Sequence, residues 1–412
     1  MLGRFFSRPW FFRVWCIQEA ALARTQLVLC GGHEVEWDKL HLTVEWIEEY
    51  QELGLDLPRH FKEIDIRGAI SMYRVNRNWA DPNKTPLLEY LNHFRHSLAT
   101  DPRDRVYAIR SLKKGEEKPL ADFDYGKSVC EVYTDVARVA TQDSKNLSAL
   151  SFVSHESTYC TKTAFPSWIP RWDRSLSVQM LWSSQKPWSA SANRKLEEFV
   201  PESLGAVSVR GVWFDSVEST TDIFSDLNEF ESNISAQNIL LQLWNECPGV
   251  LPSHPHPRTA ITTLAKALIA DDHWEGSSNC SITKCDKIYN GFLALINRIL
   301  DDRGLRSETV DPGGYLALSD GDWGRFQTRC ASVCRNRRIF RTKRGCYGLG
   351  PACMQVGDIA VVLFGGTIPY ILRSMPTGYA FLGEAYVDGI MHGELFDGLS
   401  DIQKHEERFY LR

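Results

Sequence analysis

The segment from Phe5 to Leu22 constrains the fold more than any other part of the chain. It is rich in aromatic residues, and Trp10, Val14 and Ile17 recur at the spacing of one helix face. Pro9 suits the first turn of a helix, where a missing N–H matters little. A helix this apolar needs a sheet or other helices to cover it. We therefore expect one helix over 5–22 that belongs to a larger domain.

The position of this segment near residue 1 leads to a prediction about its burial. If covering strands are absent, large apolar side chains of the helix stay in contact with solvent, and such a patch marks an interface or a truncation. We expect that not all of five side chains can be covered: Trp10, Phe11, Phe12, Val14 and Trp15.

Composition and charge describe an ordinary globular protein. The chain has 412 residues, of which 43% are hydrophobic and 24% charged. The net charge of −5 gives no reason to expect nucleic acid as a partner. No apolar run is long enough to cross a membrane, so no membrane partner is expected. The eleven cysteines are odd in number and scattered, which favours free thiols and a cytoplasmic location.

The pattern of elements along the chain predicts four regions. Residues 1–55 alternate helix, strand and helix, and 56–205 are helical with a Ser- and Trp-rich loop. A strand followed by helices fills 206–335, and short strands separated by Gly and Pro fill 336–412. Loops are expected over 113–127 and 272–283, and helices over 228–246, 258–271, 284–300 and 320–335.

The apolar alternation over 207–214 predicts a strand far from the other strands in sequence. The closely spaced strands after residue 336 are typical of a small barrel. We expect the strand over 207–214 to join that barrel, with the intervening helices as an insertion.

Several motifs of the sequence resemble those of one protein family. "SRPWFFRVWCIQE" (7–19) is followed by "TDPRDRVYAIRSL" (100–112), "PSWIPRWD" (166–173) and, within 346–394, "VGDIAVVLFGG" and "GEAYVDGIMHGE". In this order the words resemble the fungal heterokaryon incompatibility (HET) family. One departure is Arg171, where the family usually has Asp.

The resemblance implies an α+β fold. A partial TIR-like α/β HET segment comes first, a helical middle region follows, and a small β-barrel-like domain closes the chain. The family words "Y-x-A-L-S-Y-x-W-G" and "W-I-D-A-x-C-I-N-Q" do not occur before residue 7. We therefore expect an N-terminally truncated form that is inactive or regulatory.

The resemblance also implies a function. Family members act in non-self recognition when incompatible hyphae fuse, as effectors of cell death. We expect this chain to act through a protein partner or through self-association, with the exposed first helix as the contact surface.

Glu19 is the candidate catalytic residue. Trp15, Gln18 and Glu19 lie within a word that is also similar to a helix of TIR-type enzymes, in which a Glu supports cleavage of NAD. A carboxylate can stabilise the oxocarbenium-like transition state of such a cleavage. NAD is then a substrate, and no cofactor is expected. The alternative is a structural role, in which Glu19 accepts hydrogen bonds beside a tryptophan.

The acid and base pattern over 101–105 is a second candidate. Asp101, Arg103, Asp104 and Arg105 could bind a ligand, or they could lock a helix start to its neighbours through the forked guanidinium groups. The structural role is favoured. Asp101 and Pro102 suit the N-cap and first position of the helix that follows.

The remaining motifs favour structural interpretations. The basic run over 335–344 is interpreted as a solvated strand face rather than a phosphate-binding patch. The glycines of "GCYGLGP" (345–351) are interpreted as turn residues, because a phosphate cradle needs a helix after the glycines.

No metal site is expected. The thiols of four cysteines do not have the usual zinc spacing and are interpreted as buried free thiols, and tight turns explain an acidic cluster near the end of the chain. These residues are Cys330, Cys334, Cys346 and Cys353, and Glu384, Asp388, His392 and Glu394.

Overall fold

The structure is a computed structural model with two compact units. The first comprises Met1–Asp143 with Pro170–Leu176, and the second comprises Ser144–Ile169 with Ser177–Arg412. The described residues are 2–52, 65–77, 87–110, 112, 123–159, 165–176, 178–181, 188–197, 199–201, 205–225, 233–250, 256–271, 284–306, 311, 313–316, 321–397 and 405–412. Residues 113–122 of the predicted loop over 113–127, and the whole predicted loop over 272–283, lie outside them.

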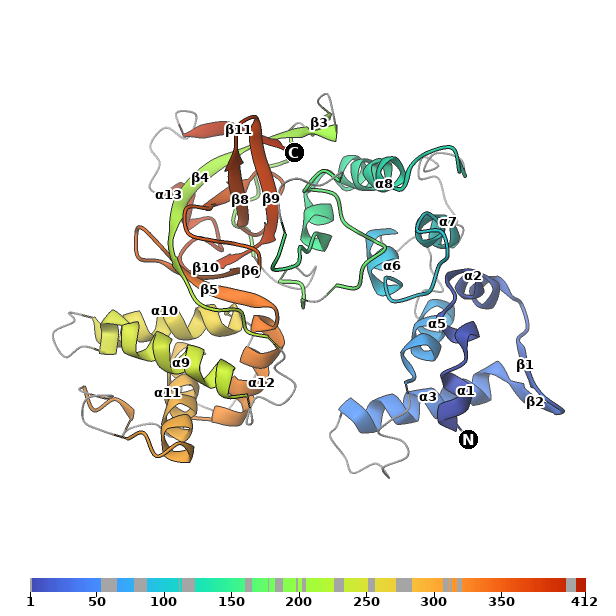
Figure 1. Cartoon of the computed structure of the whole chain (residues 1–412), viewed down its shortest axis with the longest axis horizontal. Helices are drawn as coiled ribbons and strands as arrows, with labels where there is room; N and C mark the ends of the chain where they lie inside the picture. Colours follow the sequence, from blue (N-terminus) through green and yellow to red (C-terminus); the bar gives the residue numbers. More distant parts are fainter. Residues whose placement is uncertain are drawn as a thin grey trace. The chain divides into compact units, whose positions relative to one another are not determined.

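The N-terminal unit consists of helices and one short hairpin (Figure 1). Its elements are α1 (Leu2–Phe6), η1 (Pro9–Phe12), α2 (Val14–Leu22), β1 (Leu27–Cys30), β2 (His33–Glu36), α3 (Trp37–Glu52), α5 (Arg67–Arg77), α6 (Leu87–His93), α7 (Asp104–Arg110) and α8 (Val129–Ser144).

The core of this unit forms where α2 packs against α5 and α7. Val14 and Ile17 of α2 are buried, as are Val106 and Ile109 of α7. Each pair is three residues apart, so both members lie on the same side of their helix. The apolar spacing seen in the sequence therefore marks the faces that meet.

The prediction of one helix over 5–22 is wrong, because the segment divides into α1, η1 and α2. Arg13 has an extended backbone, with φ −75° and ψ 127°. It forms an isolated parallel bridge with Leu98, and Val14 N donates to Leu98 O at 3.0 Å. This pairing with a distant segment interrupts the helical hydrogen bonds before Val14.

The burial of this segment is mixed. Phe11 and Val14 are buried. Phe12 and Trp15 are half-buried, whereas Trp10 is 39% exposed. The expectation that the five side chains are not all buried is therefore confirmed, although Trp10 is the one among them that is exposed.

The C-terminal unit combines a large sheet with a group of helices (Figure 1). Its strands are β3 (Val200–Pro201), β4 (Val207–Thr220), β5 (Arg337–Thr342), β6 (Tyr347–Pro351), β7 (Ile359–Leu363), β8 (Tyr370–Met375), β9 (Gly378–Glu384), β10 (Tyr386–Val387) and β11 (Glu406–Leu411). Its helices are η2 (Ser148–Phe152), α9 (Ile234–Glu246), η4 (Pro248–Val250), α10 (Pro257–Ile269), α11 (Lys284–Asp302), α12 (Trp323–Cys334) and α13 (Glu394–Asp397).

Strand β4 closes part of the sheet into a barrel. It pairs with β11 on one side and with β7 on the other, and the order β11-β9-β8-β7 completes the ring. Farther along, β4 also pairs with β5. The prediction that the strand over 207–214 joins the C-terminal strands is confirmed, and the helices α9 to α12 are inserted in the chain between β4 and β5. Strand β11 was not predicted.

The interior of the barrel is filled by apolar side chains from several strands. Val212 and Phe214 of β4 are buried with Val362 of β7, Ile371 of β8 and Leu382 of β9 in one hydrophobic cluster. Val212 and Phe214 are two residues apart, so they lie on the same face of β4. This burial explains the alternation in the sequence.

The glycines of 345–351 are only partly turn residues. Gly345 has φ +86° in the turn before β6, but Gly348 and Gly350 lie inside β6 and are buried. A Cβ atom on Gly348 would collide with the ring of Phe340, and one on Gly350 would meet the Met354 sulfur. The turn interpretation is therefore wrong for these two glycines, which make room for neighbouring side chains.

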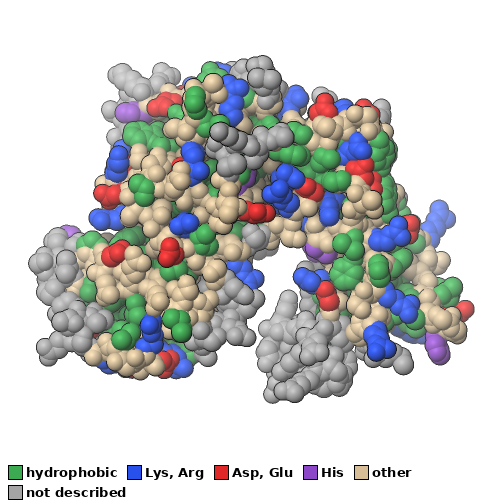
Figure 2. Space-filling view, in the orientation of Figure 1, with side chains coloured by type: hydrophobic (Ala, Val, Ile, Leu, Met, Phe, Trp, Pro, Cys, Tyr) green, Lys and Arg blue, Asp and Glu red, His purple; other side chains and the backbone are tan. Residues whose placement is uncertain are grey.

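The inserted helices occur where the sequence predicts them. Their contact is aromatic: Trp244 of α9 lies 6.2 Å from Phe292 of α11, which lies 5.6 Å from Phe326 of α12 (ring centroids). Among the described residues, no helix is long and apolar enough to span a membrane. On the visible face, acidic and basic side chains are interspersed (Figure 2).

Candidate functional site

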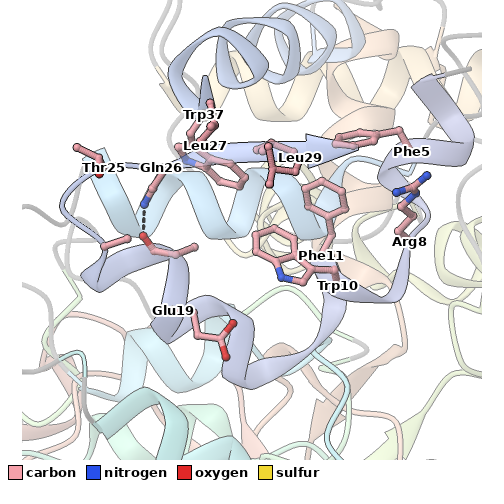
Figure 3. Close-up of a pocket in the computed structure, with 13 residues that line it drawn as sticks. Phe5, Arg8, Trp10, Phe11, Glu19, Thr25, Gln26, Leu27, Leu29 and Trp37 are labelled. Carbon is pink, nitrogen blue, oxygen red and sulfur yellow. Dashed lines mark hydrogen bonds between the residues drawn. The ribbon is translucent and has the colours of Figure 1, made fainter. Parts of the chain in front are cut away.

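The N-terminal unit contains a hollow of about 440 Å³ beside the β1–β2 hairpin (Figure 3). Apolar and aromatic side chains make up most of its walls, together with one acidic and one basic side chain. The residues that line it are Phe5, Arg8, Trp10, Phe11, Glu19, Ala20, Ala23, Thr25, Gln26, Leu27, Val28, Leu29 and Trp37.

Four aromatic rings form one wall of the hollow. Phe11 makes edge-to-face contacts with Phe5 and Trp10, each with ring centroids 5.2 Å apart. Trp10 makes a third such contact with Trp37, at 5.9 Å. The Arg8 guanidinium lies 5.7 Å from the centroid of Phe5. Edge-to-face pairs of this kind hold their rings in fixed orientations, so the wall is preorganised.

Glu19 projects from α2 at the rim of the hollow, apart from the rings of Trp10 and Phe11 (Figure 3). Its side chain is exposed. Nearby, the Gln26 amide donates a hydrogen bond to the Ala20 carbonyl oxygen and ties the hairpin to α2. Trp15 and Gln18 are half-buried and do not line the hollow. Of these three residues of α2, therefore, Glu19 alone lines the hollow.

The carboxylate of Glu19 also affects a neighbouring thiol. Burial raises the pKa of Cys16, and the negative charge of Glu19 raises it further. A thiol with a raised pKa stays protonated near neutral pH and is a poor nucleophile. The chemistry that this hollow offers is therefore that of a carboxylate and a guanidinium around an apolar surface.

Asp101 and Arg103 form a closed ion pair outside this hollow. Arg103 Nε donates to Asp101 Oδ1 at 2.9 Å, and the terminal nitrogen Nη2 donates to Oδ2 at 2.6 Å. The other nitrogen donates to the carbonyl oxygens of Tyr125 and Lys127 at 2.6 and 2.7 Å. The hydrogen bonds that Arg103 donates to the Asp101 carboxylate lower the pKa of Asp101. The expected N-cap at Asp101 is wrong, because α7 begins three residues later, at Asp104, after a turn that this ion pair holds.

Asp104 and Arg105 also have partners within the unit. Tyr125 donates its hydroxyl proton to Asp104 at 2.7 Å, and this bond raises the pKa of Tyr125 to about 12. Arg105 donates to the carbonyl oxygens of Arg95 and Ser97. The hydrogen bonds of residues 101–105 join the start of α7 to the segments around Arg95 and Tyr125, in keeping with a structural role.

The role of Arg103 can be tested against an exposed pair of the same spacing. Arg103→Ala removes two backbone contacts as well as the ion pair, so it should destabilise the N-terminal unit more than Arg67→Ala does. Arg67 pairs with Asp65, but its side chain is 76% exposed, and its loss should change stability by about 0.5 kcal/mol or less. Urea denaturation of both variants measures the difference, and equal losses would contradict the structural role.

Arg337, in the basic run over 335–344, does not lie on a solvated face. It is 2% exposed and donates to the carboxylate of Glu384 at 2.9 Å and to the Gln179 carbonyl oxygen at 3.0 Å. Burial lowers the pKa of Arg337, whereas the charge of Glu384 raises it. The solvated-face interpretation is therefore wrong for Arg337, which joins β5, β9 and the segment around Gln179.

Within the part of the chain that the structure describes, no group of three or more His, Cys, Asp or Glu side chains could hold a metal ion. Cys330, Cys334 and Cys353 are buried free thiols, as predicted, and Cys346 is free and half-buried. Glu384 accepts from Arg337, and Asp388 accepts from the Tyr386 hydroxyl at 2.9 Å. The polar cluster near the end of the chain is thus held by internal hydrogen bonds.

The rest of the hollow was missed by sequence reasoning. Arg8, Trp10 and Trp37 come together from η1, the turn before it and the start of α3, which no single period in the sequence connects. The one usable signal was the pair Gly31-Gly32, which marks a tight hairpin and so brings Leu27 and Leu29 back toward the start of α3.

Comparison with known proteins supports the resemblance seen in the sequence. Residues 318–411 match the family described as the Het-6 beta-barrel domain, which includes most strands of the observed barrel. A relative from Neurospora crassa, heterokaryon incompatibility protein 6 (OR allele), is 24% identical over an alignment that covers 99% of this chain and 67% of the relative. No solved structure matches the chain. These two matches confirm the resemblance of the chain to the fungal heterokaryon incompatibility family.

Proposed function

We propose that this chain acts in heterokaryon incompatibility, as a protein of fungal non-self recognition. The observation that carries the proposal is the match to heterokaryon incompatibility protein 6, which extends over 99% of the chain. The Het-6 barrel at residues 318–411 agrees with it. The finer proposal is that the chain contributes to cell death after incompatible hyphae fuse, through a protein partner.

The first aromatic segment is the surface proposed for that partner. Trp10 is 39% exposed beside the hollow, and Leu22 at the end of α2 is 42% exposed. Tryptophan is enriched among the residues that contribute most to binding at protein interfaces. Trp10→Ala should therefore weaken the association with the partner while leaving the barrel intact.

A genetic experiment tests the proposed role. Forced heterokaryons are made between a strain that expresses the chain and an otherwise identical strain of a different incompatibility type, and their viability is compared with that after deletion of the gene. Deletion is expected to restore growth of the mixed mycelium. Unchanged growth after deletion, and no effect when the gene is reintroduced, would contradict the proposal.

Cleavage of NAD is a second candidate function, favoured by the position of Glu19 at the rim of an aromatic hollow. A carboxylate placed there could hold ribose hydroxyls and stabilise an oxocarbenium-like transition state. The aromatic wall offers surfaces on which flat rings stack. In this function Glu19 is the catalytic residue.

For the 412-residue chain by itself, we expect no release of nicotinamide from NAD. A hydrolase must position both the ribose and the leaving group, and a misplacement of about 1 Å can lower the rate roughly a hundredfold. Among the described residues that line the hollow, Glu19 and Arg8 are the only charged side chains available for this task. The assay compares wild type with Glu19→Gln. Release by the wild type that is lost in the variant would make NAD cleavage the leading function.

A further inference from the structure

The β1–β2 hairpin is a sheet of only two strands, each four residues long. In the described residues of the unit no third strand lies beside β1, and the hairpin lies at the margin of the unit (Figure 1). An isolated two-stranded hairpin is marginally stable and gains from a third strand. The free edge of β1 is therefore a surface that could accept another strand.

The pairing register shows which residues face that edge. Cys30 pairs with His33 across the two-residue turn, and Gln26 accepts a hydrogen bond from Trp37 N at 3.3 Å. In an antiparallel pair, hydrogen-bonded and non-hydrogen-bonded residue pairs alternate along the strands. Since Gln26 and Trp37 are hydrogen-bonded, Leu27 and Leu29 belong to non-hydrogen-bonded pairs, with Glu36 and Glu34. Leu27 and Leu29 therefore direct their N–H and C=O groups away from β2, toward the free edge.

The same two residues expose their side chains. Leu27 is 55% exposed and Leu29 is 66% exposed, and both lie on one face, over the hollow (Figure 3). The free edge thus combines two sets of unpaired backbone groups with two exposed apolar side chains.

The two edges of the hairpin differ in charge. Strand β2 carries Glu34 and Glu36, whose backbone groups point to its own free edge by the same alternation, so a strand added there would lie beside two acidic side chains. Charges of this kind keep edge strands from pairing with each other. From Thr25 to Gly32, the segment that contains β1 has no charged residue. Only β1 is therefore suited to pair with a copy of itself.

We propose that two copies of this chain associate through β1, antiparallel across a two-fold axis. Leu27 pairs with the partner's Leu29 and Leu29 with the partner's Leu27, so the outward backbone groups of both strands form hydrogen bonds. Val28 lies opposite the partner's Val28 on the axis. The result is a four-stranded sheet in which the four leucines share one face. This contact lies on the hairpin and goes beyond the partner surface proposed at Trp10.

The size of the contact indicates a weak dimer. Two strands of four residues bury far less than the roughly 1,200–2,000 Å² of a stable interface. The isologous arrangement doubles the effect of any substitution, because each change occurs twice in the dimer. Association should therefore depend on concentration and be sensitive to single changes in β1.

Sedimentation velocity of the full chain over a range of micromolar concentrations tests the proposal. Wild type is expected to dimerise. Leu29→Lys places two like charges diagonally across the new strand pair, within reach of each other's long side chains, and should weaken the dimer by about tenfold or more. The matched control is Leu42→Lys on α3, since Leu42 is also an exposed leucine of this unit, at 61%; it should leave the dimer unchanged.

Crosslinking tests the register separately and does not depend on Leu29→Lys folding. Opposed residues of a non-hydrogen-bonded pair bring their side chains closest together. Val28→Cys should therefore form a disulfide-linked dimer under mild oxidation, beyond any formed by the native cysteines. Val35→Cys, on β2, should not. A wild type that stays monomeric, a dimer that Leu29→Lys leaves unchanged, or equal crosslinking by both cysteine variants would overturn the proposal.

Discussion

Glu384→Ala is expected to lower the free energy of unfolding of the C-terminal unit by about 3–5 kcal/mol. Glu384 and Arg337 are 3% and 2% exposed and form a buried ion pair. Glu384 also accepts a hydrogen bond from Leu181 N. Removal of the carboxylate leaves the Arg337 charge buried without its counter-charge, which is more harmful than the loss of the contact itself.

Two variants separate the charge from the packing. The double replacement Arg337→Met with Glu384→Leu leaves no buried charge and should be less destabilising than Glu384→Ala. Glu197→Ala removes a carboxylate that pairs with Arg210 but whose side chain is 58% exposed, and should change stability by about 1 kcal/mol or less. Hydrogen exchange on peptides of the C-terminal unit measures the loss of stability in Glu384→Ala, in the double variant and in Glu197→Ala. A loss for Glu384→Ala no larger than that for Glu197→Ala would contradict the role assigned to the pair.

Trp172→Ala is expected to destabilise the N-terminal unit by about 3–5 kcal/mol. Trp172 is fully buried, and the guanidinium of Arg95 lies 4.5 Å from its ring centroid. Burial lowers the pKa of Arg95 to about 9, so this guanidinium depends on the ring and on nearby polar groups for its stabilisation. The variant therefore creates a cavity and also removes a favourable contact of a buried cation.

The measurement for Trp172 is again hydrogen exchange, now on peptides of α6, α7 and α8. Trp46→Ala is the matched control, because Trp46 is a tryptophan of the same unit that is 41% exposed. Trp46→Ala should reduce the hydrogen-exchange protection of these peptides less than Trp172→Ala does. If peptides of the barrel lose protection in Trp172→Ala as strongly as those of the N-terminal unit, the effect is not local and the argument from packing fails.

The N-terminal unit shows how a local pattern can be correct and still give the wrong element. The spacing of Val14 and Ile17 correctly predicts the buried face of α2. The continuous helix over 5–22 fails at Arg13, which pairs with Leu98. A contact with a residue 85 positions away cannot be read from a helical period, because the period reports only neighbours within two turns.

In the barrel, too, the local sequence decided some features and the tertiary structure decided others. The sequence by itself determined that 207–214 is a strand and that α9 to α12 are helices, because each buries a face with its own period. Only the tertiary structure decided that Gly348 and Gly350 lie inside a strand and that Arg337 is buried. Their environment comes from Phe340, Met354 and Glu384, which are separated from them along the chain or lie on other strands.

At the candidate site, likewise, part could be predicted from the sequence and part could not. The sequence singled out Glu19 through the similarity of its motif to a helix of TIR-type enzymes, but it did not identify the other residues around the hollow. Arg8, Trp10, Trp37 and the leucines of β1 meet because the Gly31-Gly32 turn brings the start of α3 back toward α2. Local sequence fixes periodicity and turns through short-range sterics and burial, whereas the position of side chains from separate elements is fixed only when those elements pack.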